Sequence, residues 1–319
     1  MKVIYGIGKA KKNFKNPVLA IGVFDGVHLG HRYLIQKINR QARAMHGTSM
    51  VMTFFPHPMH VLKPSTNLPL LVSLRHRLKL IESLGVDVCV VVNFTNQFSH
   101  LNADGFIKQY IVDFVNPREI WIGQNFRFGK SREGDIRLLR EFEKTGGFKV
   151  HGIAPRRIQG DVVSSTRIRK LILAGKIVLA ARLLGRPFSI FGKVIRGDGR
   201  GSTLGFPTAN INPLPGIIAP CGVYMVEVVI AGHIYQGMAN IGRRPSFYRK
   251  RNSLKIEAHI FNFRVNIYHK EIEIRFLKKI RNEKKFDSNE KLTQQLNKDE
   301  EMIRTLFLKI SKPAFPAVI

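Results

Sequence analysis

Cysteine is scarce in this chain of 319 residues. The two cysteines, Cys89 and Cys221, stand far apart. Two distant cysteines exclude both a disulfide framework and a C-x-x-C metal site. Cys89 lies in the apolar stretch 86–92 and is expected to be a small core residue, whereas Cys221 lies in a turn rich in proline and glycine.

Acidic residues are also few. Aspartate and glutamate number 22 against 52 lysines and arginines, a formal net charge of +30. Such an excess suits anionic partners: nucleotides, nucleic acid or an acidic membrane surface. Residues 1–185 hold 29 basic and 11 acidic residues, and residues 186–319 hold 23 and 11. Because the excess of basic residues is spread over both halves of the chain, we consider a single nucleic-acid-binding surface the less favoured interpretation.

Long apolar runs are absent. None approaches the roughly 20 residues that a membrane-spanning helix needs. Residues 1–16 are basic but lack the apolar stretch and cleavage site of a signal peptide. We therefore expect a cytoplasmic location and no membrane partner. The length allows two domains, which we place at 1–185 and 186–319.

Between residues 18 and 185, short apolar runs alternate with amphipathic segments. The expected strands are 18–24, 49–55, 86–94, 119–123 and 148–153. The expected helices are 32–45, 74–84, 103–115, 135–144 and 166–173. This alternation predicts a parallel sheet with helices on its faces. Such sheets bind ligands outside the carboxyl ends of their strands.

Beyond residue 185 the pattern changes to short β-type runs separated by glycine, proline and asparagine. They cover 190–195, 222–230, 233–240, 253–261 and 271–276. Runs of this kind predict a small antiparallel barrel or sandwich. A final amphipathic helix is expected over 288–308, with its apolar stripe covering the barrel.

The clearest chemical signal is the stretch 22–31, at a predicted strand-to-helix junction. It holds two histidines, His28 and His31, beside Gly26 and Gly30. A helix N-terminus offers unpaired N–H groups, and glycines allow a polyphosphate to approach the main chain. The alternative is that the histidines only cap the helix. The strand before them and the helix after them favour a phosphate site.

Three further stretches of the first half belong with the histidines. Segments 53–58 and 123–130 end strands with aromatic rings that can flank a flat ligand, although packing explains the phenylalanines equally well. Arg127 and Lys130 are cations suited to phosphate. Segment 163–169 opens a helix with three hydroxyl residues, which either cap the helix or bind phosphate.

In the second half, segment 197–210 is rich in glycine, which lets backbone N–H groups face phosphate. Thr208 and Asn210 follow a rigid proline and offer oxygens to Mg²⁺. A plain turn between strands is the alternative. Glu257 lies in a β-type run and can act as a general base for a hydroxyl, or else form a cross-strand ion pair.

Taken together, these motifs resemble the bacterial bifunctional riboflavin kinase/FMN adenylyltransferases, also called FAD synthetases, over about residues 18–308. The first half is similar to nucleotidylyltransferases through 28–31 and 164–169, with narrower marks at 22–26, 56–58 and 126–130. The second half is similar to riboflavin kinase through 205–210, 240–245, 257–259 and 280–286. The resemblance implies an α/β Rossmann-like nucleotidylyltransferase domain with a parallel sheet. An all-β six-stranded barrel domain with a C-terminal helix follows it.

Two reactions are implied by the resemblance. In the second domain the 5′-hydroxyl of riboflavin attacks the γ-phosphate of ATP, giving FMN. In the first domain the phosphate of FMN attacks the α-phosphate of ATP, giving FAD and pyrophosphate. Neither step needs a covalent enzyme intermediate. The implied small molecules are ATP, riboflavin, FMN and FAD, with Mg²⁺ as the metal, and a homo-oligomer stays open.

The resemblance also assigns roles to residues. Catalytic roles fall to His28, His31 and Glu257. ATP and phosphate binding falls to Gly22, Phe24, Asp25, Gly26, Gly30, Ser164, Ser165, Thr166, Arg169 and Gly205. Flavin binding falls to Phe55, Pro56, His57, Asn125, Phe126, Arg127 and Phe128. Metal binding falls to Thr208 and Asn210.

Three positions depart from the family pattern. Phe55 stands where an acidic residue is usual, Asn125 where an aspartate is usual, and Ser202 where arginine is common. Loss of negative charge at the first two lowers the expected efficiency or flavin affinity of the adenylyltransferase site. A chain with kinase activity alone is therefore one alternative. A basic nucleic-acid-binding protein is another, from a different class.

Overall fold

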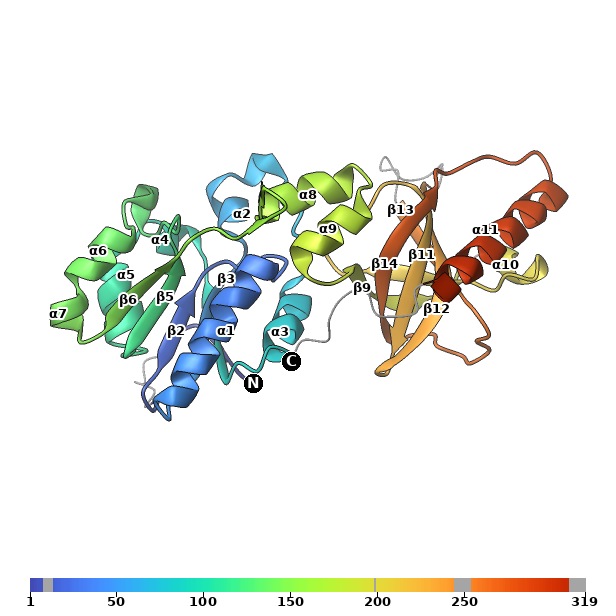
Figure 1. The fold of residues 1–319 in the computed structure, drawn as a ribbon. Coiled ribbons are helices and arrows are strands. Elements are labelled where there is room, and N and C mark those ends of the chain that lie inside the picture. The colour runs from blue at the N-terminus through green and yellow to red at the C-terminus, as the bar shows by residue number, and fades with distance from the viewer. Residues whose placement is uncertain (8–13, 198, 244–253, 310–319) are drawn as a thin grey trace. The chain divides into compact units, whose positions relative to one another are not determined.

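A computed structural model describes residues 1–7, 14–197, 199–243 and 254–309 of the chain (Figure 1). Internal contacts divide the chain into two compact units, Met1–Ser165 and Thr166–Ile319. The expected domain boundary after residue 185 stays a prediction. Among the helices that the structure describes, none combines the length and apolar character of a membrane span.

A six-stranded parallel sheet forms the centre of the first unit, as the sequence predicts. Its strands lie in the order β1-β4-β3-β2-β5-β6, and every neighbouring pair is parallel. The strands are β1 (Lys2–Tyr5), β2 (Val18–Ile21), β3 (Ser49–Phe55), β4 (Val88–Asn93), β5 (Glu119–Gly123) and β6 (Lys149–Ile153). The chain runs outward from β2 to one edge and from β5 to the other. The sheet therefore has a switch point between β2 and β5, where sheets of this kind bind ligands.

Helices cover both faces of this sheet, because alternate residues of a strand point to opposite faces. One face buries Leu19 and Met50 against α5 (Ala103–Phe106), η2 (Ile107–Val112) and α6 (Ile136–Glu141). The other face buries Val18 and Val51 against α1 (Leu29–Ala44) and α3 (Leu74–Glu82). The shorter elements are α2 (Pro58–Leu62), η1 (Pro64–Thr66), α4 (Asn96–Ser99), η3 (Lys130–Arg132), α7 (Glu143–Gly146), β7 (Arg157–Ile158) and β8 (Asp161–Val162).

A closed barrel forms the second unit, so the sequence alternative of a sandwich is wrong. Its six strands close in the order β10-β13-β12-β11-β14-β9, with antiparallel neighbours. The strands are β9 (Phe188–Ile195), β10 (Ala209–Pro213), β11 (Gly222–Ile230), β12 (His233–Arg243), β13 (Leu254–Ile260) and β14 (Glu271–Arg281). The helices are α8 (Ser165–Leu173), α9 (Ile177–Leu184), α10 (Arg200–Thr203) and α11 (Asn289–Lys309). Helix α9 contacts β9 and β14.

The C-terminal helix α11 lies against the barrel, as its apolar stripe predicts (Figure 1). Ile303 is fully buried and packs in one cluster with Met225, Met238 and Phe261. Beside this cluster, the guanidinium of Arg281 on β14 contacts Asp299 of α11, with N–O distances of 2.8 Å for both Nε and Nη2 to Oδ2. Asp299 is 2% exposed. A bidentate pair of this kind fixes the helix against the strand.

Candidate active sites

The first candidate site is a cavity of about 240 Å³ at the switch point of the parallel sheet. Its walls come from segments 21–24, 28–34, 123–126 and 153–156, together with Val163. These segments follow β2, β5 and β6 or begin α1, so the cavity lies at the carboxyl ends of the strands. Both predicted catalytic histidines line it, and we call it the histidine cavity.

The two histidines are stacked at the start of α1. Nδ1 of His28 accepts the backbone N–H of His31 at 3.4 Å, and the ring centroids lie 3.6 Å apart. His28 therefore caps helix α1, and both histidines also line the cavity. Because Nδ1 of His28 is an acceptor, a neutral His28 carries its proton on Nε2. Burial, reinforced by the charges of His28 and Arg77, holds the pKa of His31 well below its usual value.

The loop between β2 and α1 has an unusual backbone. Strand β2 ends at Ile21, three residues before its expected end, and Phe24 and Val27 have positive φ angles of 53° and 42°. Residues with a side chain rarely adopt this region. The Phe24 side chain is completely buried and packs 5.1 Å from the ring of His31. Burial therefore holds the strained loop, and the loop aims the histidines.

Asp25 and Gly26 shape this loop from behind instead of lining the cavity. The Asp25 carboxylate accepts the backbone N–H groups of Leu71 at 3.0 Å and Val72 at 3.3 Å. Gly26 has a φ of 82°, and a Cβ there would lie 2.6 Å from Cδ1 of Leu71. Only glycine fits that approach. Of the other predicted glycines, Gly22 and Gly30 line the cavity.

The hydroxyl-rich segment meets the histidine loop. The Ser165 hydroxyl donates to the main-chain oxygen of Asp25 at 2.9 Å. Ser164 and Ser165 are both half-buried. The structure thus brings together two motifs 140 residues apart in the chain. Thr166 and Arg169 lie in α8 beyond the division between the units, and their role at this site stays a prediction.

Two of the predicted flavin-binding residues, Asn125 and Phe126, line the histidine cavity. Arg127 instead forms an ion pair with Asp135 at 2.6 Å, and Phe128 is buried against Phe106. These two side chains hold the loop in shape. Their predicted contact with flavin stays a prediction.

The remaining three, Phe55, Pro56 and His57, lie at the end of β3 and outside the described lining of the cavity. The Phe55 side chain is 41% exposed. His57 caps α2, where its Nδ1 accepts the N–H of Met59 at 3.1 Å. The exposed ring is free to meet a flat ligand, whereas His57 is occupied in building the turn.

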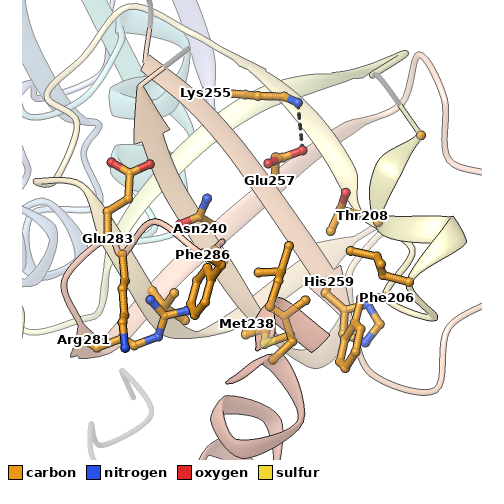
Figure 2. A pocket seen from close by; sticks show the side chains of 18 residues that line it. Phe206, Thr208, Met238, Asn240, Lys255, Glu257, His259, Arg281, Glu283 and Phe286 are labelled. Atoms are coloured by element: carbon orange, nitrogen blue, oxygen red, sulfur yellow. Dashed lines mark ion pairs between the residues drawn. The ribbon is translucent and has the colours of Figure 1, made fainter. Parts of the chain in front are cut away.

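The second candidate site is a cavity of about 380 Å³ in the barrel unit (Figure 2). Its apolar side chains are Leu204, Phe206, Val223, Met238, Ala239, Phe286, Leu292 and Leu296. Its polar side chains are Thr208, Asn240, Lys255, Glu257, His259, Arg281, Glu283 and Lys284. We call it the glutamate cavity. An apolar wall facing a few convergent polar groups is typical of a small-molecule site.

Glu257 stands in a row of polar residues across three strands. Its register partners are Asn210 on β10 and Asn240 on β12, so the three residues share a face of the barrel. Nζ of Lys255 lies 2.9 Å from Oε1 of Glu257 (Figure 2). Glu257 therefore has an ion pair, but within its own strand and not across strands as the sequence alternative supposed.

Asn210 has the character of a cation ligand. It is 7% exposed, and its Oδ1 has no hydrogen-bond partner in the described structure. A buried oxygen of this kind is costly and suits a hard cation that seeks oxygen ligands. A Cβ at Gly197 would overlap Nδ2 of Asn210, so the glycine-rich loop packs directly on this side chain. Within the described residues, no group of three His, Cys, Asp or Glu side chains forms a metal site.

Thr208 lies between two hollows. It lines the glutamate cavity and also a neighbouring hollow of about 330 Å³, formed by Ser202, Pro207 and segment 263–268, which we call the loop hollow. Two ligands seated in these hollows would meet at Thr208. Gly205, predicted to bind ATP, has a φ of 82° and makes the turn before this segment without lining the glutamate cavity.

His259 braces the same segment. Its Nδ1 forms a hydrogen bond with the carbonyl oxygen of Pro207 at 2.8 Å, and its Nε2 lies 3.8 Å from Glu300 of α11. Within the predicted motif 257–259, Glu257 and His259 therefore both line the cavity, and His259 also holds the neighbouring turn. Of the motif 240–245, residues 244 and 245 lie outside the described part of the chain.

The sequence analysis did not identify three basic residues that lie in or near the two cavities. Lys255 pairs with Glu257. Arg156 lines the histidine cavity with its guanidinium 5.2 Å from the ring of Tyr33. Arg77 is completely buried on α3. The one available signal is that Arg77 stands four residues before the buried Ile81, on the same helix face.

Comparison with known proteins assigns the two halves of the chain to two different families. A family described as FAD synthetase matches residues 10–167, and one described as riboflavin kinase matches residues 184–307. The bifunctional riboflavin kinase/FMN adenylyltransferase of Buchnera aphidicola subsp. Schizaphis graminum is 39% identical over 309 residues, covering 96% of this chain and 99% of the relative. The protein of the same name from Escherichia coli is 38% identical over 317 residues, covering 98% and 100%.

The chain is also similar to a solved structure over nearly its whole length. It is that of a protein named macrolide-efflux protein, from Streptococcus pneumoniae, whose sequence is 32% identical to this chain. The TM-score is 0.86, over 95% of this chain and 99% of the other. The likeness supports the fold, and the name applies to the Streptococcus protein alone.

Proposed function

Because the chain belongs to the family of bifunctional riboflavin kinase/FMN adenylyltransferases, we propose that its two cavities divide the two reactions between them. The chain makes FMN from riboflavin and ATP, and FAD from FMN and ATP. We assign the first reaction to the glutamate cavity and the second to the histidine cavity. What supports the assignment is that each cavity holds one of the two predicted catalytic sets.

In the glutamate cavity, the flavin ring packs on the apolar wall and its 5′-hydroxyl reaches Glu257. Oε1 of Glu257 faces Lys255, which leaves Oε2 to take the hydroxyl proton. The hydroxyl oxygen attacks the γ-phosphorus, the bond to the bridging oxygen breaks, and ADP leaves. ATP lies in the loop hollow, so its terminal phosphate meets the flavin at Thr208.

Asn210 Oδ1 and the Thr208 hydroxyl would hold Mg²⁺ there, together with the ATP phosphates. The unpartnered buried oxygen of Asn210 supports this assignment. Mg²⁺ prefers oxygen ligands and keeps few protein contacts when phosphates complete its shell. When bound, it neutralises charge that develops on the transferring phosphate.

In the histidine cavity, a phosphate oxygen of FMN attacks the α-phosphorus of ATP and pyrophosphate leaves. The nucleophile is already an anion, so no base is required. His28 donates from Nε2, and His31 acts as a neutral ring because its pKa is depressed. Both steady the charge that builds on the α-phosphate. Ser164, Ser165, Thr166 and Arg169 hold the leaving phosphates, and Asn125 and Phe126 contact the flavin.

The small molecules of these reactions are ATP, riboflavin, FMN and FAD. We propose the cytoplasm as the compartment, since both reactions consume ATP. Cell fractionation with antibody detection tests that location, and recovery of the protein outside the soluble fraction would contradict it.

Two substitutions test the division of labour. His31→Ala is expected to lower the rate of FAD formation by about 100- to 1,000-fold, the usual loss when one transition-state contact is removed. It leaves FMN formation from riboflavin unchanged. Glu257→Ala is expected to do the reverse when FMN is supplied. Chromatographic separation of the three flavins measures both rates in one sample, and loss of both activities in a folded variant would contradict two independent sites.

A further inference from the structure

Arg77 is an unusual residue for a helix that covers a sheet. Its side chain is 0% exposed although it carries a permanent positive charge. Nη1 donates to the Thr53 hydroxyl at 3.1 Å and to the carbonyl oxygen of Phe54 at 3.0 Å. Both acceptors lie at the carboxyl end of β3. Burying a guanidinium costs free energy unless its charge is compensated, so a buried arginine at this position requires an explanation.

These hydrogen bonds continue into the histidine loop. The Thr53 hydroxyl, which accepts from Arg77, donates to the carbonyl oxygen of Val23 at 2.9 Å. Val23 lines the histidine cavity. Asp25, two residues further on, attracts the guanidinium, while burial lowers the pKa of Arg77. Helix α3, strand β3 and the β2–α1 loop are thus joined through two side chains, Arg77 and Thr53.

The same charge acts on the histidine pair. The titratable or charged side chains around His31 are His28 on the stacked ring, Arg32 next along α1, Arg77 from α3 and Arg156 on the cavity lining. Nε and Nη2 of Arg77 have no hydrogen-bond partner in the described structure. The opposite charge that attracts this guanidinium is the buried carboxylate of Asp25 in the β2–α1 loop. Electrostatic interactions between buried charges are weakly screened.

We propose that Arg77 is a positioning residue for adenylyl transfer: its buried guanidinium braces the loop that carries His28 and His31 and keeps a fixed positive charge behind them. The proposal rests on the assignment of adenylyl transfer to the histidine cavity. Arg77 does not line that cavity, so it acts through Thr53, Asp25 and the electrostatic field. A fixed cation there favours a neutral His31, which offers both a donor and an acceptor, and adds attraction for phosphate.

The direct test is the titration of His31 by NMR in the full chain with isotope-labelled histidine, its signal assigned by its loss in His31→Gln. In the native chain, His31 is expected to titrate well below the usual pH range of histidine, in agreement with its depressed pKa. Arg77→Met keeps most of the side-chain volume and removes the charge. It is expected to raise the titration midpoint of His31, because the repulsion from the Arg77 charge is removed. An unchanged midpoint overturns the electrostatic part of the proposal.

Kinetics separate positioning from packing. Arg77→Met is expected to lower kcat for FAD formation about 10- to 100-fold with KM values for ATP and FMN within about threefold. Arg77→Lys restores the low midpoint of His31 and part of kcat. Ile81→Ala is the matched control, since Ile81 is fully buried on the same face of α3. It lowers the melting temperature but leaves the titration and kcat as in the native chain. A control that loses as much kcat as Arg77→Met makes Arg77 a packing residue and overturns the proposal.

Thr53→Val decides the case if Arg77→Met does not fold. It removes the hydroxyl between Arg77 and Val23 and keeps the charge, so we expect a lower kcat for FAD formation and an unshifted His31 titration. Full kcat in this variant overturns the bracing role. FMN formation from riboflavin is measured in each sample as a check on active protein. If His31→Ala retains FAD formation, the proposed function fails, whereas the NMR titration still reports on Arg77.

Discussion

At the level of single residues, each candidate site contains a buried polar atom that lacks a hydrogen-bond partner in the described structure. His31 Nδ1 and Asn210 Oδ1 are each buried and without a hydrogen-bond partner in the described structure. Leaving such a group unpaired costs about 1–3 kcal/mol. A protein tolerates that cost where a ligand completes the contact. Asn210 is the sharper case, because a neutral amide oxygen next to a glycine-rich loop suits a cation with its phosphates.

Asn210→Ala is expected to lower kcat for FMN formation about 10- to 100-fold and to raise the Mg²⁺ concentration that gives half the maximal rate. FAD formation from supplied FMN is unaffected. Asn212→Ala is the control, since Asn212 is an exposed residue of the same strand. Titration of the FMN rate with Mg²⁺ measures the effect. An unaltered Mg²⁺ dependence in the Asn210 variant removes this residue from the metal site.

At the level of elements, the loop between β5 and α6 is shaped by one carboxylate. Asp135 caps α6, accepting the N–H groups of Arg137 at 2.8 Å and Leu138 at 3.3 Å, and it pairs with Arg127. A hydrogen bond from the Arg137 side chain, reinforced by these contacts, holds the pKa of Asp135 far below its usual 3.8. The loop that presents Asn125 and Phe126 therefore depends on an ionised Asp135.

Asp135→Asn is expected to lower the melting temperature by a few degrees at pH 7. Since the folded pKa is depressed, the stabilisation is complete above the unfolded value of about 3.8 and is lost as pH falls through the folded pKa. The difference between the native chain and the variant should therefore narrow below pH 4. Circular-dichroism melts from pH 7 to pH 3 measure it, with the exposed Asp113→Asn as control. An equal difference at both ends of that range would exclude the ionised carboxylate as its cause.

At the level of the whole molecule, the excess of 52 basic over 22 acidic residues is distributed over both halves. Both reactions use ATP, so a broad positive field favours the approach of the shared substrate. The same field attracts any polyanion weakly. Binding of that kind falls steeply with salt and differs from a specific nucleic-acid site.

Single-stranded RNA is accordingly expected to leave both flavin rates within about twofold at physiological salt. Association seen at low salt should disappear as salt is raised, because diffuse charges are screened. Flavin assays with added RNA, beside a fluorescence-anisotropy titration at three salt concentrations, provide the measurement. Tight RNA binding that survives physiological salt in a chain without flavin turnover would favour the nucleic-acid class.

Local pattern alone was sufficient for many of the strands and helices. Strands 49–55, 119–123 and 222–230 agree with the structure to the residue, because unbroken β-type runs bounded by turns are local signals. Strands β1 and β10 were missed; in β10, the two asparagines and the proline are residues that are rare in strands. Helix 103–115 was also expected as one element, but it divides into α5 and η2.

The tertiary structure decided strand pairing and burial, which local sequence patterns do not determine. A sequence with alternating short strands allows a barrel or a sandwich, and only the pairing of β9 with both β10 and β14 closes the barrel. An arginine in an amphipathic helix is normally assigned to the solvent, and only packing on β3 shows Arg77 to be buried. The sequence by itself determined the type and order of most elements and which residues are candidates for the chemistry, through side-chain type and local periodicity. Only the tertiary structure decided which of them meet, because burial and contact depend on segments far apart in the chain.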